Sequence, residues 1–277
     1  MVKAEVMLSN KDLAKYYLAN LNNRWSNAST LHRRNFDGHI VSMKQSGTHW
    51  LKNTLAGILA QKYNLPPLEH IQDDSIVGHT KSLPKYKNIP QIVHSHAFPH
   101  ALSLKVPFLH YPKYLVLLRD MRSSLVAHYE RFKDDYISED FGTYLLGDPW
   151  QKKYQNDIFI NIRFMNEWGD LCKRFPNQVT FIRYEDMQSD LYSVMRKVCD
   201  FFDIPEISDE VLKTAIEDNT KDKMAKKKPN PKVSTTIVRT TGKSSEDYFT
   251  PENMKTFDEI CGQLLRHKLG YDYKIKS

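Results

Sequence analysis

The sequence predicts an α/β fold with a central parallel β-sheet flanked by helices. Short apolar segments of strand length alternate with longer amphipathic segments, which is the pattern of a parallel sheet covered on both faces. A polar turn around Gly47 joins one expected strand to a helix. Polar clusters also follow the other expected strands, and the carboxyl ends of parallel strands share one edge of a sheet. We therefore expect the functional site at that edge.

Residues 1–37 are expected to form an N-terminal helical segment, because Leu13, Tyr16, Tyr17 and Leu21 would share one helix face. The expected strands are a run ending at Val41, then 91–94, 113–118 and 179–182. The expected helices are one starting at Trp50, then 123–132, 156–175, 191–202, 208–219 and one starting at Thr250. Residues 66–90 and 136–154 are expected to be loops. No repeat or linker divides the chain, so we expect one domain over residues 1–277.

The composition is typical of a globular protein, with 40% hydrophobic and 26% charged residues. The formal net charge of +7 favours an anionic partner, either a nucleic acid or a small polyanionic cosubstrate. No run approaches the roughly 20 apolar residues of a membrane span, and the start lacks a secretory apolar segment. We therefore expect a cytoplasmic protein without membrane contact. The three cysteines have no metal-ligand spacing, so no metal site is expected.

The stretch from His39 to Leu51 has the order of a phosphate-binding motif: a buried strand, a turn with one glycine, and a helix. Backbone N–H groups of the first helical turn lack intrahelical partners, and the helix dipole favours an anion there. Gly47 lets the chain bend sharply and lets a ligand oxygen approach the backbone. The motif predicts a P-loop-like phosphate site, although a plain helix cap would give the same local sequence.

This stretch resembles the Pro-Lys-Ser-Gly-Thr-Thr-Trp-Leu loop of the cytosolic-type sulfotransferases that use 3′-phosphoadenosine-5′-phosphosulfate (PAPS). The resemblance implies that the 5′-phosphosulfate is held by Lys44, Gln45, Ser46, Gly47, Thr48 and His49, with Trp50 near the adenine. Gln45 occupies the position of the family's catalytic lysine, and Lys44 that of its proline. Either Lys44 or another cation such as Lys52 would then stabilise charge on the bridging oxygen.

Three further segments resemble the same family in the same order along the chain. His96 matches the histidine that acts as general base, and His94 replaces a lysine two residues earlier. Arg119 matches the arginine that grips the 3′-phosphate. The serine usual eight residues later is Ala127, so that contact would pass to Ser123 or Ser124. The last match is to a Tyr-Glu-Asp segment, in which the tyrosine, here Tyr184, contacts the adenine.

The resemblance continues more loosely to residue 273. Thr220 and Met224 are similar to an adenine-wall motif. A later segment resembles one that closes over the 3′-phosphate, which implies roles for Arg239, Thr240, Thr241, Gly242 and Lys243. The lysine-rich run between them suggests that residues 221–245 form a basic mobile flap, although a solvated charged loop is the commoner explanation.

The acceptor pocket is expected between the loops 64–90 and 134–155. Its substrate-binding residues are expected to be His94, Phe98, Tyr136, Phe141 and Tyr144, and further aromatic walls could come from Tyr63 and Trp150. Acidic residues in the same loops, namely Asp134, Asp135, Glu139, Asp140 and Asp148, suggest a small polar or cationic acceptor.

The family resemblance implies in-line transfer of a sulfuryl group from PAPS to a hydroxyl or amine of a small acceptor, without a metal. One alternative is an ATP-dependent P-loop kinase, but the chain lacks Gly-x-x-x-x-Gly-Lys-Ser/Thr. Another is a non-catalytic protein that binds RNA or another polyanion, but the lysine run has no interleaved aromatic residues for base stacking. We therefore expect no nucleic-acid partner. The family's Lys-Thr-Val dimer motif is not recognisable, which leaves the oligomeric state open.

Overall fold

The computed structural model describes residues 8–26, 36–99, 112–227 and 244–276. The strands are β1 (Gly38–Ser42), β2 (Gly78–His79), β3 (Ile92–Ser95), β4 (Lys113–Leu118) and β5 (Val179–Arg183). The helices are α1 (Asn10–Ser26), α2 (Thr48–Lys62), α3 (Met121–Phe132), α4 (Phe141–Leu145), α5 (Ile158–Arg174), α6 (Tyr184–Ser189), α7 (Leu191–Phe201), α8 (Asp209–Glu217), α9 (Lys221–Lys226), α10 (Ser245–Tyr248) and α11 (Pro251–Leu264).

The five strands form one sheet in the order β2-β3-β1-β4-β5, and every neighbouring pair is parallel. The central strand β1 aligns Ile40 with His94 on one side and with Leu115 on the other. The predicted α/β fold with a parallel sheet is therefore confirmed. All five strands end at one edge, which brings together the turn after β1 and the segments after β3, β4 and β5.

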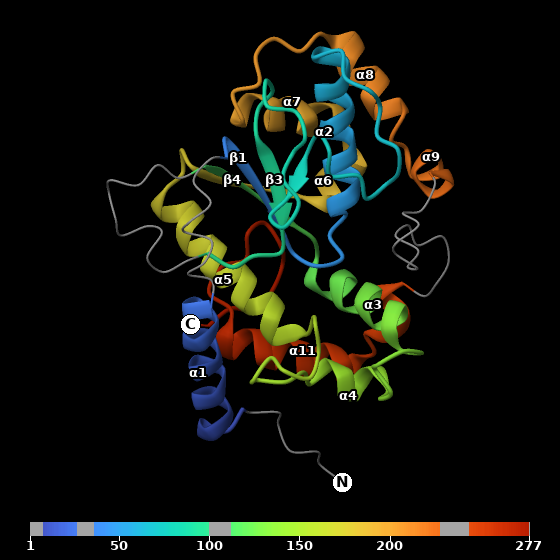
Figure 1. Ribbon diagram of the computed structural model, residues 1–277. Coiled ribbons are helices and arrows are strands. Elements are labelled where there is room, and N and C mark those ends of the chain that lie inside the picture. Colours follow the sequence, from blue (N-terminus) through green and yellow to red (C-terminus); the bar gives the residue numbers. More distant parts are fainter. Residues whose placement is uncertain (1–7, 27–35, 100–111, 228–243, 277) are drawn as a thin grey trace.

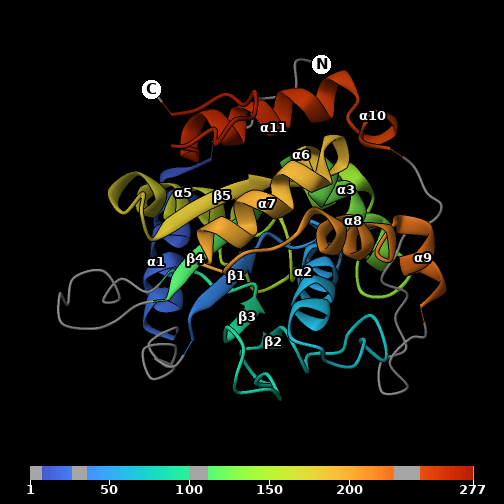
Figure 2. The same cartoon turned by 90° about the horizontal axis from the view of Figure 1, so that it is seen from above.

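Helices cover both faces of the sheet (Figures 1 and 2). Alternate residues of each central strand enter two separate cores, as the period of two in a strand requires. Ile40 and Leu115 pack in the core with α2, α7 and α8. Val41 and Val116 pack in the core with α3, α5 and α11. These strands are buried on both faces, which explains their continuous apolar sequence.

Five short elements are absent from the sequence-based prediction. Residues 66–90 contain β2, and residues 136–154 contain α4, which begins at the N-cap Asp140. Helix α6 lies directly after β5, α9 lies at the start of the basic segment, and α10 lies shortly before α11. Each of these elements has two to six residues, which is too short for hydrophobic periodicity to identify.

The helices α3, α5 and α11 begin where the sequence offers a capping side chain. The Asp120 side chain accepts a hydrogen bond from Ser123 N at the start of α3, and Asp157 accepts one from Ile160 N at the start of α5. Thr250 caps α11, with Pro251 at its first position, as predicted. Within the described residues, no helix combines the length and apolar character that crossing a bilayer requires.

Candidate active site

The turn between β1 and α2 has a conformation that depends on Gly47. Its φ of 86° lies in the left-handed region, and a Cβ atom there would lie 2.7 Å from Cδ2 of Tyr184. Hydroxyl groups fix the rest of the turn. Ser46 Oγ donates to Met43 O at 2.5 Å, and the Ser42 and Thr48 hydroxyls are 2.8 Å apart. The predicted strand–turn–helix motif is therefore present, with the backbone close to the ring of Tyr184.

Three residues predicted to bind the cosubstrate meet beside this turn. Arg119, after β4, donates from Nη1 to Gln45 O at 2.8 Å, and its guanidinium lies 4.7 Å from the ring centroid of Tyr184. Trp50 packs edge-on against Tyr184 with centroids 5.9 Å apart. Among the described residues, the buried Arg119 Nε and Trp50 Nε1 have no hydrogen-bond partner. The cluster therefore offers unused donors and two aromatic rings in one place.

The two candidate serines of α3 have different surroundings. Ser124 is fully buried, and its Oγ donates to Lys44 O at 2.8 Å. This bond ties α3 to the turn after β1. Ser123 is only half-buried, and its backbone N–H is bound by Asp120. Of the two hydroxyl groups, that of Ser123 is the one better placed to meet a ligand.

The two candidate cations also differ in their partners. Lys44 Nζ donates to the neutral carbonyl oxygen of Gln155 at 2.5 Å, and burial lowers the pKa of the amine. Lys52 is fully buried, and its Nζ lies 2.6 Å from Oδ1 of Asp74. An anionic ligand could replace a carbonyl as the partner of Lys44 more readily than it could replace a carboxylate.

His96 is held in a form suited to a general base. Its Nδ1 lies 2.8 Å from the carbonyl oxygen of Ser42, which can only accept, so Nδ1 carries a proton. Desolvation by the surrounding protein lowers the pKa of His96 to about 4, although the residue remains exposed. The imidazole is therefore neutral at neutral pH, and the lone pair of Nε2 is available to take a proton.

A group of imidazoles lies next to His96 at the ends of β2 and β3. His94 Nε2 is 3.3 Å from Asp74 Oδ1, and the His94 ring centroid is 4.9 Å from that of His79 and 6.2 Å from that of His49. Burial lowers the pKa of His94, and it lowers that of His49 to about 3. Both rings are therefore neutral. In the described part of the chain, the buried Nδ1 atoms of His94 and His49 have no partner.

Sequence reasoning missed the contribution of Asp74 and His79 to this group. Burial acts to raise the pKa of Asp74, but the hydrogen bond from His94 and the charge of Lys52 lower it to about 2. The carboxylate therefore stays ionised and orients His94. Both missed residues lie in the stretch predicted to be loop. The pairing of β2 with β3 brings His79 to the site, and Asp74 is held there by Lys52 and His94.

The predicted aromatic residues of the acceptor pocket lie in two kinds of environment. Phe98 and Tyr136 are half-buried; the Arg163 guanidinium lies 3.3 Å from the Phe98 ring centroid. Phe141 and Tyr144 lie in the hydrophobic core instead, and Tyr144 is fully buried. These two side chains pack against protein aromatic rings, so we do not include them in the proposed pocket.

The acidic residues of the same loop mostly serve local structure. Asp140 caps α4, and Asp148 accepts backbone hydrogen bonds from Trp150, Lys152 and Lys153. Glu139 forms an ion pair with Lys153. These contacts remove the sequence-based argument for a cationic acceptor, because most of the charge in this loop is already engaged.

The remaining predicted residues are only partly within the described chain. Thr220 caps α9, and the buried Met224 of that helix receives a hydrogen bond from Asn53 Nδ2 of α2 at 3.6 Å from its sulfur. Arg239, Thr240, Thr241, Gly242 and Lys243 lie outside the described residues, as does most of the predicted flap 221–245. Its first residues form α9.

No group of three or more His, Cys, Asp or Glu side chains in the described ranges is arranged to hold a metal ion.

Comparison with known proteins places the chain in a family. The sulfotransferase domain model matches residues 37–268. The structure of mouse sulfotransferase SULT7A1 complexed with PAP is similar, with a TM-score of 0.60, 18% identity and coverage of 89% of each chain. Retinol dehydratase in a complex with retinol and PAP gives a TM-score of 0.57 at 16% identity, covering 94% of this chain and 97% of that one. No curated protein sequence matches significantly. The chain therefore belongs to the sulfotransferase domain family, which confirms the resemblance found in the sequence.

Proposed function

We propose that this protein transfers the sulfuryl group of PAPS to a hydroxyl or amine of a small polar acceptor, with His96 as general base. The observation that carries the proposal is the 2.8 Å hydrogen bond from His96 Nδ1 to the carbonyl of Ser42. This bond holds the neutral imidazole of His96 against Ser42, the last residue of β1, and β1 leads into the phosphate-binding turn. The site thus combines a proton acceptor with an anion-binding backbone, as acyl- or group-transfer chemistry requires.

The cosubstrate would bind across the ends of β1, β4 and β5. The turn from Lys44 to His49 would receive the 5′-phosphosulfate, and Arg119 the 3′-phosphate, through guanidinium donors suited to oxyanions. The rings of Trp50 and Tyr184 would flank the adenine. Support comes from the contact of Arg119 with both Gln45 O and the Tyr184 ring, and from the PAP held by the structurally similar mouse sulfotransferase.

In the proposed reaction, His96 Nε2 takes the proton from the acceptor hydroxyl or amine as that atom attacks sulfur. A new bond forms between sulfur and the acceptor atom, and the bond from sulfur to the bridging phosphate oxygen breaks, in line. The products are the sulfated acceptor and adenosine 3′,5′-bisphosphate (PAP). Lys44 would exchange its carbonyl partner for the bridging oxygen and stabilise the negative charge that develops there.

The acceptor would lie against His94, His49 and Phe98. The unpartnered Nδ1 of His94 is a hydrogen-bond acceptor, because the Nε2 of this neutral ring donates its proton to Asp74. The buried Nδ1 of the neutral His49 ring is a second unpartnered polar atom. A buried polar atom without a partner is unfavourable, so an acceptor that donates hydrogen bonds would be preferred over a hydrocarbon-like one. This chemistry, rather than the acidic loop, supports a polar acceptor.

The test is release of PAP from PAPS in the presence of a matched acceptor panel. The panel should pair amino alcohols and polyols with simple phenols and steroids of similar size. The proposal expects acceptor-dependent PAP release, fastest with the donor-rich compounds. PAP binding without turnover on any acceptor would contradict the catalytic assignment, and faster turnover of the apolar compounds would contradict the proposed acceptor class.

A further inference from the structure

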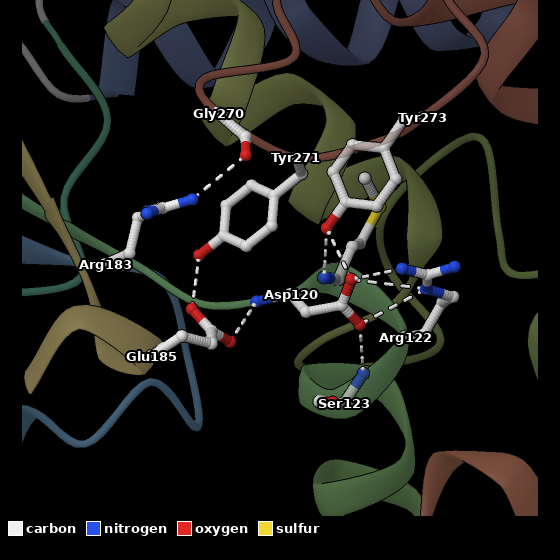
Figure 3. A network of polar contacts seen from close by, with 9 residues as sticks. Asp120, Arg122, Ser123, Arg183, Glu185, Gly270, Tyr271 and Tyr273 are labelled. Atoms are coloured by element: carbon white, nitrogen blue, oxygen red, sulfur yellow. Dashed lines mark hydrogen bonds and ion pairs between the residues drawn. The ribbon is translucent and has the colours of Figure 1, made fainter. Parts of the chain in front are cut away.

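The C-terminal tail, residues 265–276, returns from α11 to the edge of the sheet where the candidate site lies (Figure 3). It turns at Gly270, whose φ of 88° is in the left-handed region. The next residues place two tyrosine rings, Tyr271 and Tyr273, in a stack with centroids 5.4 Å apart. Both rings face the corners that follow β4 and β5.

Tyr273 is tied to the corner after β4. Its ring is 2% exposed, and its hydroxyl accepts a hydrogen bond from Met121 N at 2.6 Å and donates one to Asp120 Oδ2 at 3.1 Å. Asp120 also caps α3 through Ser123 N. The tyrosine therefore satisfies the first free N–H of α3 and orients the capping carboxylate. Arg119 is the residue immediately before this capped corner.

Tyr271 is tied to the corner after β5 in a similar way. Its hydroxyl donates to Glu185 Oε2 at 2.8 Å, and Glu185 Oε1 accepts from Asp120 N at 2.9 Å. One carboxylate thus joins the two corners, and the tail holds that carboxylate in place. Tyr184 is the residue immediately before Glu185.

The turn that presents the tyrosines is itself fixed to β5. Arg183 Nη1 donates to Gly270 O at 3.0 Å, and the same guanidinium pairs with Asp186. A Cβ atom on Gly270 would lie 3.3 Å from Arg183 Nη1 and would also have to adopt an unfavourable φ. The tail is therefore held in one arrangement at both corners.

From these contacts we propose that Tyr271 and Tyr273 are positioning residues for the cosubstrate. This inference rests on the proposed function. It gives the C-terminal tail a part in cosubstrate binding, although the tail itself would not touch the ligand. The stacking of Arg119 on Tyr184 requires two corners, more than 60 residues apart in sequence, to keep a fixed separation. Each hydrogen bond of the two tyrosine hydroxyls is to a residue one or two positions after Arg119 or Tyr184.

The test measures PAP affinity by calorimetry for Tyr273→Phe, Tyr271→Phe and the double variant. Each change removes a hydroxyl and keeps the ring. Tyr192→Phe is the matched control, because the Tyr192 hydroxyl bonds Arg196 of α7 and Asp209 of α8, away from these corners. The inference expects the dissociation constant of PAP to rise roughly five- to tenfold for each single variant. The KM for the acceptor and the affinity of the control should stay within twofold of wild type.

A purely structural role would give a different pattern. It would lower the unfolding midpoint of the ligand-free protein and leave the PAP affinity of the folded protein unchanged, which would overturn the inference. A double-mutant cycle sharpens the result. If Tyr273 acts through Arg119, then Tyr273→Phe should change affinity less than twofold in the Arg119→Ala background. If wild-type protein fails to bind PAP at all, the proposed function fails, and not merely the role of the tail.

Discussion

The proposed cosubstrate side of the site lies at the ends of β1, β4 and β5, and the proposed acceptor side lies at the ends of β1, β2 and β3. The two sides use different interactions. On the first side, the Arg119 guanidinium stacks on Tyr184 and binds a backbone carbonyl. On the second side, the neutral imidazole of His94 bonds the carboxylate of Asp74, and the ring of His79 lies against that of His94. The first arrangement suits a ligand of fixed charge and a planar base. The second suits a neutral ligand recognised by hydrogen bonds.

His96 lies between the two sides, and its replacement should have the largest effect. We expect His96→Ala to lower kcat by about 10³-fold, because no other imidazole in the described ranges is hydrogen-bonded to Ser42. PAP affinity should remain within twofold of wild type. The control is His267→Ala, which removes a histidine paired with Asp170. A kcat above one tenth of wild type in His96→Ala would exclude this residue as the base.

The two candidate lysines should respond in opposite ways. Lys44→Met should lower kcat by roughly 100-fold, because it removes the cation proposed for the bridging oxygen, with little change in stability. Lys52→Met should leave Asp74 without its cation and lower the free energy of unfolding by about 3 kcal/mol. Turnover by each variant and chemical denaturation of each provide the readouts. If kcat fell in Lys52→Met and not in Lys44→Met, Lys52 would be the cation that stabilises the bridging oxygen, and the role proposed for Lys44 would be wrong.

The cosubstrate side alone should respond to Arg119→Ala. Loss of a charged hydrogen-bond donor should raise the dissociation constant of PAP roughly 10- to 100-fold. The control is Arg196→Ala, which removes an arginine of α7 that pairs with Asp209 of α8. It should leave PAP affinity unchanged. Titration calorimetry measures both. Equal affinities for wild type and Arg119→Ala would show that the 3′-phosphate binds elsewhere.

The smallest expected effect is that of moderate acid. Because desolvation lowers the pKa of His96 to about 4, its base form should persist well below the ordinary histidine pKa of roughly 6.5. The proton-accepting form is lost only as the pH falls through the lowered pKa. We expect kcat/KM to stay within twofold between pH 7.5 and 5.5. A fall of tenfold over that interval, with the protein still folded, would contradict the protonation state inferred for His96.

The same comparison shows what can be predicted from the sequence. On the proposed cosubstrate side, the residues stand in short motifs directly after strands, so the meeting of Arg119 and Tyr184 beside the turn could be predicted once the strands were recognised. The places of Asp74 and His79 could not be predicted. His79 lies in β2, a two-residue strand without a sequence pattern, and Asp74 is placed by contacts with the distant residues Lys52 and His94. The contacts of Tyr271 and Tyr273 could not be predicted from the sequence either, because they depend on how the chain returns after α11. The sequence also cannot distinguish a core aromatic residue such as Tyr144 from a pocket wall.

The central claim, that this edge of the sheet binds a 3′-phosphorylated adenine nucleotide, is tested most directly by thermal shift. Wild-type protein should be compared with PAP, with 5′-AMP, and with ATP plus magnesium. At about 100 times its dissociation constant, a ligand adds roughly 2.7 kcal/mol of stability, which should raise the unfolding midpoint by about 5–10 °C. We predict that shift with PAP and a much smaller one with 5′-AMP. No shift with PAP, or a larger one with ATP and magnesium, would contradict the account.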